Sequence, residues 1–307
     1  MATDREQAHR LERRSVVQIS PTGPPPATAP FSAHLTDLVD DEVVVEFDLA
    51  GVVDELGTVE SIEGAPAHPI LGSLLGANAH RGFRKLLEPL RTGDLDEQAL
   101  RRLLFDLPIA TMIMMQAFIV RTPEGQRSHT TMSADTPGVN QCAGWVAGGQ
   151  MLTLIRDNDG LLEMDPSPRL IGDNHLGDPS PRELATNATR RRRHYVIDQQ
   201  GDELHLRVNQ RDSYATPDGV ERALHWWILE LTAGASDHVI RSIAVDNGGL
   251  PWVECPSAAG SAQRLVGEPL EDLEALVGGT FKGVTTCTHL NDTLAALAGV
   301  PELLQRL

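Results

Sequence analysis

Apolar and polar residues alternate in three stretches of the C-terminal half, and this pattern predicts strands. The stretches are "ELHLRVNQRDSY" from Glu203, "ALHWWILELTA" from Ala223 and "HVIRSIAVDN" from His238. Turn-forming sequences, "TPDGV" and "AGASD", separate them. A period of two in β-branched and aromatic residues, bounded by such turns, is typical of neighbouring antiparallel strands. We therefore expect a β-meander here.

The spacing of apolar residues becomes helical after this meander. In "CPSAAGSAQRLVG", Pro256 suits a first helical position and Gly267 a helix end, which places Cys255 near the N-cap. "PLEDLEALV" predicts a short amphipathic helix. In "CTHLNDTLAALAGVP" the leucines recur at helical spacing, with Cys287 or Thr288 as the cap. Strands followed by helices indicate an α+β fold.

Two matches between the halves of the chain indicate an internal duplication. "RLERRSVVQIS" from Arg10 resembles "TRRRRHYVIDQ" from Thr189, and "TVESIEGAPAHP" from Thr58 resembles "VIRSIAVDNGGL" from Val239 at nearly the same offset. We therefore predict two pseudo-repeated halves, each an antiparallel meander followed by helices. A polar segment rich in Pro, Asp and Gly is interpreted as the linker between them. The predicted organisation is a first repeat at 1–155, a linker at 156–188 and a second repeat at 189–307.

The first repeat differs from the second in its chemistry. By the same match, Leu74 and Asp106 stand where the second half has Cys255 and Cys287, so the first half lacks those thiols. Its apolar helix "PIATMIMMQAFIV" is methionine-rich and is either core or the lining of an apolar pocket. The Gly-rich segment "GVNQCAGWVAGGQ" has no counterpart in the second half and could close over a pocket between the halves.

Charge and cysteine usage narrow the function classes. With 43 acidic against 26 basic residues the net charge is −17, which argues against nucleic acid or an anionic membrane as partner. We see no signal peptide, and the longest apolar run, 107–120, is shorter than the roughly 18 residues of a membrane span. Three widely spaced cysteines favour free thiols in a reducing cytoplasm. The basic run "RRRR", Arg190 to Arg193, is interpreted as an exposed strand start or an interface charge.

Cys255 and Cys287 are both predicted at helix N-termini, and this makes them the candidate site. The positive end of a helix dipole favours a thiolate and lowers the thiol pKa. His289 follows Cys287 by two residues and could reach the same ligand, and thiolate with imidazole is a donor set of zinc or of an iron–sulfur cluster. His225 or Asp246 would supply a third or fourth donor. The alternative is that these cysteines are small buried side chains with no ligand.

The end of the chain resembles a bacterial family known only as a domain of unknown function. The residues that carry this likeness are "PWVECPSA" and "CTHLNDTL", since members of that family end in a "GCTHL-x-[DE]-L-L" motif. The order of strands, Cys255 before a helix and Cys287 opening the last helix also resembles NifU-like iron–sulfur scaffolds and TSCPD domains. This second resemblance implies a NifU-like fold for the second half and a ligand near His225. The chain departs from the scaffold pattern because His225 replaces a cysteine and because His289 follows, rather than precedes, its cysteine.

The function expected from these features is that of a small-molecule enzyme. Cys255, Cys287, His225 and His289 are its candidate metal ligands, and His289, Asp246 or His225 its candidate acid–base groups. Zinc would support hydrolysis, hydration or elimination on a partly apolar substrate; without metal, an activated thiolate and a histidine would do acid–base or nucleophilic work. The first alternative is a non-enzymatic zinc or iron–sulfur carrier of NifU-like type, with iron–sulfur the weaker expectation. The second is a binding or structural module with inert thiols; self-association into a homo-oligomer stays open.

Overall fold

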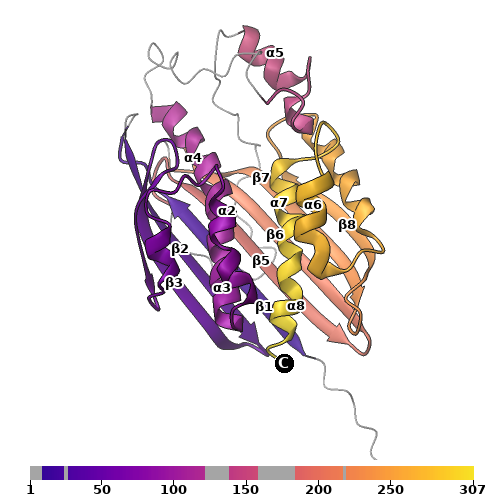
Figure 1. Ribbon diagram of the computed structural model, residues 1–307. Helices are drawn as coiled ribbons and strands as arrows, with labels where there is room; N and C mark the ends of the chain where they lie inside the picture. The colour runs from indigo at the N-terminus through magenta and orange to yellow at the C-terminus, as the bar shows by residue number, and fades with distance from the viewer. Residues whose placement is uncertain (1–8, 24–26, 122–137, 158–183, 217–218) are drawn as a thin grey trace, which may run out of the picture.

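A single eight-stranded antiparallel sheet forms the frame of the molecule. The computed structural model describes residues 9–23, 27–121, 138–157, 184–216 and 219–307 (Figure 1). Within these ranges the strand order is β4-β3-β2-β1-β5-β6-β7-β8. The strands are β1 (Arg10–Ile19), β2 (Thr28–Val39), β3 (Glu42–Asp54), β4 (Val59–Ala65), β5 (Thr189–Gln200), β6 (Glu203–Ala215), β7 (Glu221–Gly234) and β8 (Ile240–Gly249).

The prediction of two pseudo-repeated halves, each with its own meander, and of a NifU-like second half is wrong. Strand β1 pairs with β5 along its whole length, from Arg10 opposite Asp198 to Ile19 opposite Thr189. An unpaired edge strand leaves its backbone N–H and C=O groups open to another strand, and here β1 and β5 satisfy each other's edge. The result is one continuous sheet, in which no duplicated two-half arrangement is evident. Most of the predicted linker, 158–183, lies outside the described residues.

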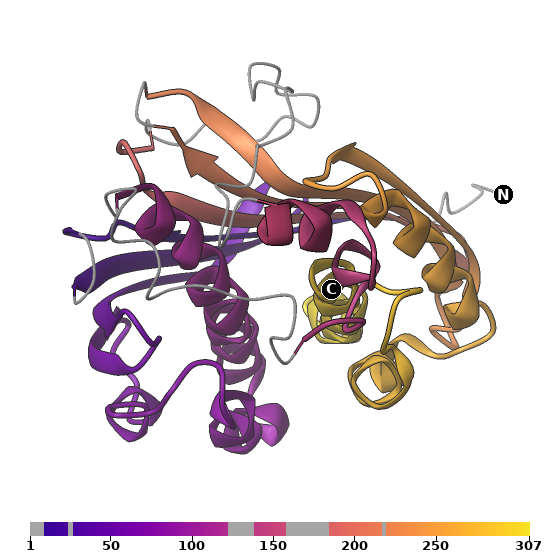
Figure 2. The same ribbon diagram turned by 90° about the horizontal axis from the view of Figure 1, so that it is seen from above.

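Helices cover one face of this sheet, as Figure 2 shows. Alternation in β2 buries Phe31, Ala33 and Leu35 on that face, where they pack with residues of α3 such as Leu100. The α-helices are α1 (Ile70–Ser73), α2 (Phe83–Leu86), α3 (Leu95–Phe105), α4 (Leu107–Arg121), α5 (Gln150–Asp157), α6 (Leu273–Thr280), α7 (Thr288–Ala296) and α8 (Val300–Leu304). The 3₁₀-helices are η1 (Glu88–Thr92), η3 (Ala143–Trp145), η4 (Cys255–Leu265), η5 (Leu270–Asp272) and η6 (Leu297–Gly299).

Two apolar cores lie beneath the helices, one on each side of the β1–β5 junction. One core joins β1–β4 to α1–α4, and the other joins β5–β8 to η4, α6, α7 and α8. The methionine-rich helix α4 contributes Met114, 1 % exposed, to the first core. Among the residues that the structure describes, no helix combines the length and the apolar character needed to cross a membrane.

Polar residues occupy the helix-facing positions of the sheet near the middle of this assembly. Tyr195 and Ile197 of β5 face the second core, and alternation puts Arg191 and Arg193 on the same face. In β6, Val208 faces that core and Gln210 and Asp212 continue the series. All of these side chains are buried. A layer of buried charge therefore lies beside the apolar core, and Arg191 and Arg193 are not exposed as the basic run predicted.

Candidate functional site: a buried Asp–His–His cluster beside three thiols

Three charged or titratable side chains lie side by side across β5, β6 and β7. Arg191 is directly opposite Asp212, and Asp212 is directly opposite His225. Residues opposite each other in an antiparallel pair share a face, with their Cβ atoms about 4.5–5.5 Å apart. The sheet register thus brings a guanidinium, a carboxylate and an imidazole together, although they are far apart in sequence.

Helix α7 adds a second imidazole to this row. Asp212 Oδ2 lies 2.5 Å from His289 Nδ1, and the rings of His289 and His225 are stacked with centroids 3.6 Å apart and planes 9° from parallel. A carboxylate can only accept, so His289 donates Nδ1–H to it and its Nε2 is left as a base. The two histidines are 7 % and 9 % exposed. A small part of the pair therefore stays accessible at the edge of a buried site.

The charges around this cluster keep Asp212 ionised and His225 neutral. Burial would raise the pKa of Asp212, but the Arg191 charge and the hydrogen bond from His289 outweigh it and lower that pKa to about 2. Arg191 Nη1 donates to both Asp212 oxygens, at 2.8 and 2.9 Å. Burial, followed by the electrostatic effect of the neighbouring His289 imidazole, holds the pKa of His225 well below its ordinary value. His225 Nδ1 is buried and has no hydrogen-bond partner among the described residues.

Arg191 also ties the cluster to two further buried carboxylates. Its Nε donates to Asp106 at 3.0 Å, and its Nη2 bonds Asp292 of α7. Arg193 contacts the same two carboxylates, at 2.9 Å for Asp106 and 2.6 Å for Asp292. Because every one of these side chains is nearly or fully buried, an unpaired member would be costly. We call this group of Arg191, Arg193, Asp106, Asp212 and Asp292 the charged seam.

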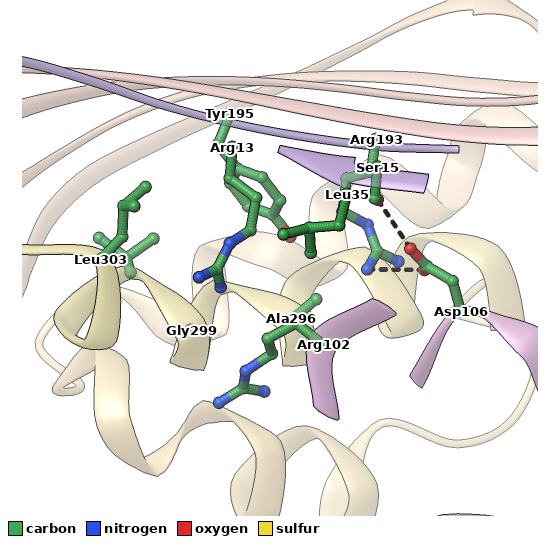
Figure 3. A pocket seen from close by; sticks show the side chains of 11 residues that line it. Arg13, Ser15, Leu35, Arg102, Asp106, Arg193, Tyr195, Ala296, Gly299 and Leu303 are labelled. Atoms are coloured by element: carbon green, nitrogen blue, oxygen red, sulfur yellow. Dashed lines mark hydrogen bonds and ion pairs between the residues drawn. The ribbon is translucent and has the colours of Figure 1, made fainter. Parts of the chain in front are cut away.

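A small cavity beside the charged seam is too small for a substrate. Its volume is about 20 Å³, and Figure 3 shows its lining residues, with Ser15 and Arg193 both bonded to Asp106. The Tyr195 hydroxyl has no hydrogen-bond partner in the described part of the chain. A cavity of this volume is close to the lower limit for one water molecule. A substrate cannot bind in this cavity.

A larger open cleft lies next to the same helix. Its volume is about 770 Å³, and it is bordered by the C-terminal end of α3, by α4, α6 and α7 and by residues 138–141. Phe105, Ile109 and Phe281 give it apolar walls, and Lys282 and Arg84 add positive charge. Arg84 stacks on Phe105, 3.9 Å from the ring centroid to its guanidinium carbon, and bonds Asp292. Asp292 thus belongs both to the cleft and to the charged seam. Glu274 and Asp292 also line the cleft, so it fits a molecule that is partly apolar and partly polar.

Cys287 and His289 do not reach the same point, although they are two residues apart. Cys287 is the N-cap of α7, and side chains separated by two positions on a helix diverge by about 200°. Cys287 joins the apolar core, and its sulfur lies close to Trp227, whereas His289 turns to Asp212. The predicted single Cys/His site is therefore divided into two neighbouring clusters.

Both predicted thiols are buried and protonated. Cys255 begins η4, and Cys255 and Cys287 are each 4 % exposed. Burial raises the pKa of each to about 12, although backbone N–H groups act in the opposite direction. The lowering of the thiol pKa expected at a helix start is not found. The free energy of removing a thiolate from water is larger than the stabilisation that a few N–H dipoles provide.

Cys142 is the third member of this thiol cluster. The backbone N–H of Ala143 donates to the Thr286 carbonyl at 2.8 Å, which holds Cys142 and Cys287 on adjacent chain segments. A Cβ on Gly144 would lie 2.8 Å from Cys255 Sγ. The three thiols are near enough that a charge on one would raise the pKa of another. Residues 142–144 are thus wedged against both predicted cysteines.

The four predicted metal ligands do not form one tetrahedral set. Among the described residues, Asp212, His225 and His289 are grouped with ligand atoms within 4.8 Å of one another, and neither Cys255 nor Cys287 joins them. The histidines themselves cannot share an ion as they stand, because an imidazole lone pair lies in the ring plane and these planes are nearly parallel. Zinc bound by these four side chains does not fit this geometry. Asp246 lies on β8 and is exposed. Its neighbour Val245 packs against the core, so Asp246 is on the opposite face of the strand.

Sequence reasoning missed the five residues of the charged seam, namely Arg191, Arg193, Asp106, Asp212 and Asp292. The sequence did indicate that Arg191 and Asp212 face inward, because each occupies a position that alternates in step with the buried apolar residues of its strand. Asp106 and Asp292 carried no such signal, since their partners come from distant segments.

Comparison with known proteins finds one family model that matches part of the chain. Residues 188–302 match a family described as "Protein of unknown function (DUF2889)". This match spans β5–β8 and most of the helices that follow, and so includes Asp212, His225 and His289. No curated protein matches the chain, and no solved structure matches it.

Proposed function

We propose that this protein is an enzyme that transfers a proton on a small molecule at Asp212, His225 and His289. The observation that carries this proposal is the 2.5 Å contact between Asp212 and His289 Nδ1, with a neutral imidazole stacked on the other side. A carboxylate behind a histidine fixes its tautomer and stabilises the imidazolium that forms when the histidine accepts a proton. Such an arrangement makes His289 Nε2 a general base.

Each group has a distinct role in this proposal. The proton moves from the substrate, or from a water that attacks it, to His289 Nε2, and the Asp212 carboxylate balances the new charge. Arg191 keeps Asp212 ionised and fixed in position. His225 has the lowered pKa of a buried imidazole, so it stays neutral and can hydrogen-bond to the substrate or to a leaving group. Hydration, elimination and hydrolysis can each proceed with this pair of a base and a neutral hydrogen-bonding partner.

The cleft beside α7 defines the substrate class. Its apolar walls and the Lys282 ammonium suit a small carboxylic acid or ester with an apolar portion, whereas Arg84 is paired with Asp292. Thr288, Asn291 and Asp292 line the cleft from the same helix that carries His289. We propose that the reacting part of the substrate reaches the exposed edge of the two histidines while its apolar part stays in the cleft.

A non-enzymatic zinc or iron–sulfur carrier is the less favoured proposal. A carrier that transfers its metal to a partner needs accessible ligands, whereas Cys255 and Cys287 are 4 % exposed. We also propose a cytoplasmic location, because free thiols are typical of a reducing compartment.

A substrate screen in heavy water tests the enzyme proposal. We would incubate the protein in D₂O with a panel of small carboxylic acids, 2-hydroxy acids and esters bearing apolar chains. Mass spectrometry would follow deuterium uptake, water loss and hydrolysis. His289→Gln should lower any activity by about 10²–10⁴-fold, and Asp212→Asn should lower it through loss of the oriented tautomer. His205→Gln, an exposed histidine of β6, is the matched control. No conversion by the wild type, or full conversion by His289→Gln, would refute the proposal.

A further inference from the structure

The thiol cluster lies next to the proposed catalytic residues but has no part in their chemistry. It contains all three cysteines of the chain. They come from three separate segments: Cys142 just before η3, Cys255 at the start of η4 and Cys287 at the cap of α7. Packing alone does not explain why thiols from three distant segments meet at one place, because any small apolar side chain would fill the same volume.

Backbone N–H groups near the three cysteines act to lower the pKa of each thiol, although burial acts more strongly in the opposite direction. For Cys142, these are the N–H groups of Gly144 and Trp145. The N–H groups of His289 and Leu290 serve Cys287 in the same way, and that of Trp252 serves Cys255. A neutral thiol is a weak acceptor, whereas a metal-bound thiolate is stabilised by such donors. The backbone is thus arranged for thiolates at a place where burial alone would forbid them.

A bound cation would resolve this conflict between burial and the arranged donors. We propose that Cys142, Cys255 and Cys287 bind a thiophilic metal centre through their three sulfurs. Thiolate ligands suit zinc, copper(I) and iron–sulfur clusters. The three sulfurs do not all lie within 4.8 Å of one another in the described structure, whereas tetrahedral zinc holds its sulfurs about 3.8 Å apart. A single ion would therefore draw the segment around Cys142 inward, and a cluster of several metal atoms would need less movement.

Such a centre would also position one wall of the cleft. Residues 138–141, which border the cleft, immediately precede Cys142. Apart from the thiols, this segment is held to the molecule by contacts such as the Ala143 bond to Thr286 and the Gln150 N–H bond to Glu254. Metal binding would clamp the segment to η4 and α7 at a third point. The role assigned to the metal is structural, and it does not depend on which reaction the histidines carry out.

Proton release on metal binding gives the sharpest test, because thiols with raised pKa values are protonated at neutral pH. Each must lose its proton to become a ligand. We would titrate chelator-treated, reduced protein with Cd²⁺ by calorimetry in two buffers of different ionisation enthalpy. The expected result is one Cd²⁺ per chain and the release of about three protons per ion. Absence of binding, or release of two or fewer protons, would overturn the proposal.

Single variants identify the ligands. Cys142→Ser, Cys255→Ser and Cys287→Ser should each lower Cd²⁺ affinity by at least about tenfold and remove one proton from the count. Ser261→Ala changes another buried side chain of η4 and should leave both values unchanged. Should a cysteine variant fail to fold, the wild-type proton count still decides. Unchanged affinity in all three variants would also overturn the proposal. Because the readout is metal binding, this result is independent of whether the enzyme proposal holds.

Discussion

The charged seam and the thiol cluster lie on either side of the first turn of α7, and they differ in whether their side chains are ionised. On the His289 side, the charged seam is ionised: buried Arg191 faces three carboxylates and Asp212 keeps a pKa of about 2. On the Cys287 side, three thiols with little opposite charge nearby stay protonated, and two of them have a pKa of about 12. Cys255 and Cys287 are buried like the charged seam, so burial does not distinguish them from it. What differs is the presence of a counter-charge.

This contrast teaches what each cluster can do without a ligand. The charged seam has its compensating charges in the protein, so it is ready for proton transfer as it stands. The thiol cluster has only backbone dipoles, which offset part of the desolvation cost of a thiolate but not all of it. The Arg191 guanidinium neutralises the carboxylates of the charged seam. In the thiol cluster, a metal cation would have to neutralise the thiolates. The following predictions test this difference, beginning with the largest effect.

Removing Arg191 should bring the charged seam closer to the thiol cluster, because its buried carboxylates lose part of their counter-charge. Arg191→Met leaves Asp106, Asp212 and Asp292 with fewer partners in a buried place. We expect the free energy of unfolding to fall by about 3–5 kcal/mol, measured by urea denaturation at pH 7. Arg207→Met is the matched control, because Arg207 is 53 % exposed and pairs with exposed Glu230; its effect should stay below about 0.5 kcal/mol. A loss below about 1 kcal/mol for Arg191→Met would show that the seam is not a strongly coupled charge network.

Alkaline pH should destabilise the thiol cluster. The ordinary thiol pKa is 9.0, and the folded values of Cys255 and Cys287 are about 12. Since the raised pKa means that the unfolded chain loses these protons first, the stability contributed by the neutral thiols is present below pH 9 and is lost between pH 9 and 12. At pH 10.5 each thiol should reduce the free energy of unfolding by roughly 2 kcal/mol.

The measurement is urea denaturation at pH 8 and pH 10.5, with the wild type compared with a Cys255→Ala, Cys287→Ala variant. Other groups titrate in both proteins, so the difference between their pH slopes isolates the thiols. Equal slopes would mean that the thiols are not held protonated by the fold.

The contrast between the clusters also shows what the sequence could predict. Strands β6, β7 and β8, the helix beginning near Cys287 and the position of Cys255 at a helix start all followed from local patterns. Pairing of β1 with β5 did not, because it joins segments about 180 positions apart and no local signal specifies which edges meet. The same non-local pairing buries Arg191 and Arg193, which a composition-based interpretation left in solvent. His225 and His289 were singled out from sequence, but their carboxylate partner became visible only with the register of β6 and β7.

Acid should destabilise the charged seam, the reverse of the thiol cluster. The pKa of Asp212 falls from its ordinary 3.8 to about 2 in the folded protein. Its stabilising contribution is therefore fully present above about pH 4 and is lost as pH falls through 2. We expect about 2 kcal/mol of the acid-induced loss to come from this residue. Urea denaturation between pH 4.5 and 2 should show a flatter pH dependence for Asp212→Asn than for the wild type. Asp246→Asn, at an exposed site, should leave the slope unchanged; an unchanged slope in Asp212→Asn would contradict the assignment.

The smallest expected effect concerns how tightly the segment of Cys142 fits the thiol cluster. A Cβ at Gly144 would lie 2.8 Å from Cys255 Sγ and 2.9 Å from Trp252 Cδ1. These neighbours are buried and must move, so Gly144→Ala should lower the free energy of unfolding by about 1–2 kcal/mol. Gly260→Ala in η4 is the control, because a Cβ there meets nothing within 4 Å; it should be neutral or slightly stabilising. If a metal centre must draw this segment inward, Gly144→Ala should in addition weaken Cd²⁺ binding, while Gly260→Ala should not. A neutral Gly144→Ala would show that the segment rests loosely on the thiols, and the cluster would then owe its proximity to chance packing rather than to a fitted site.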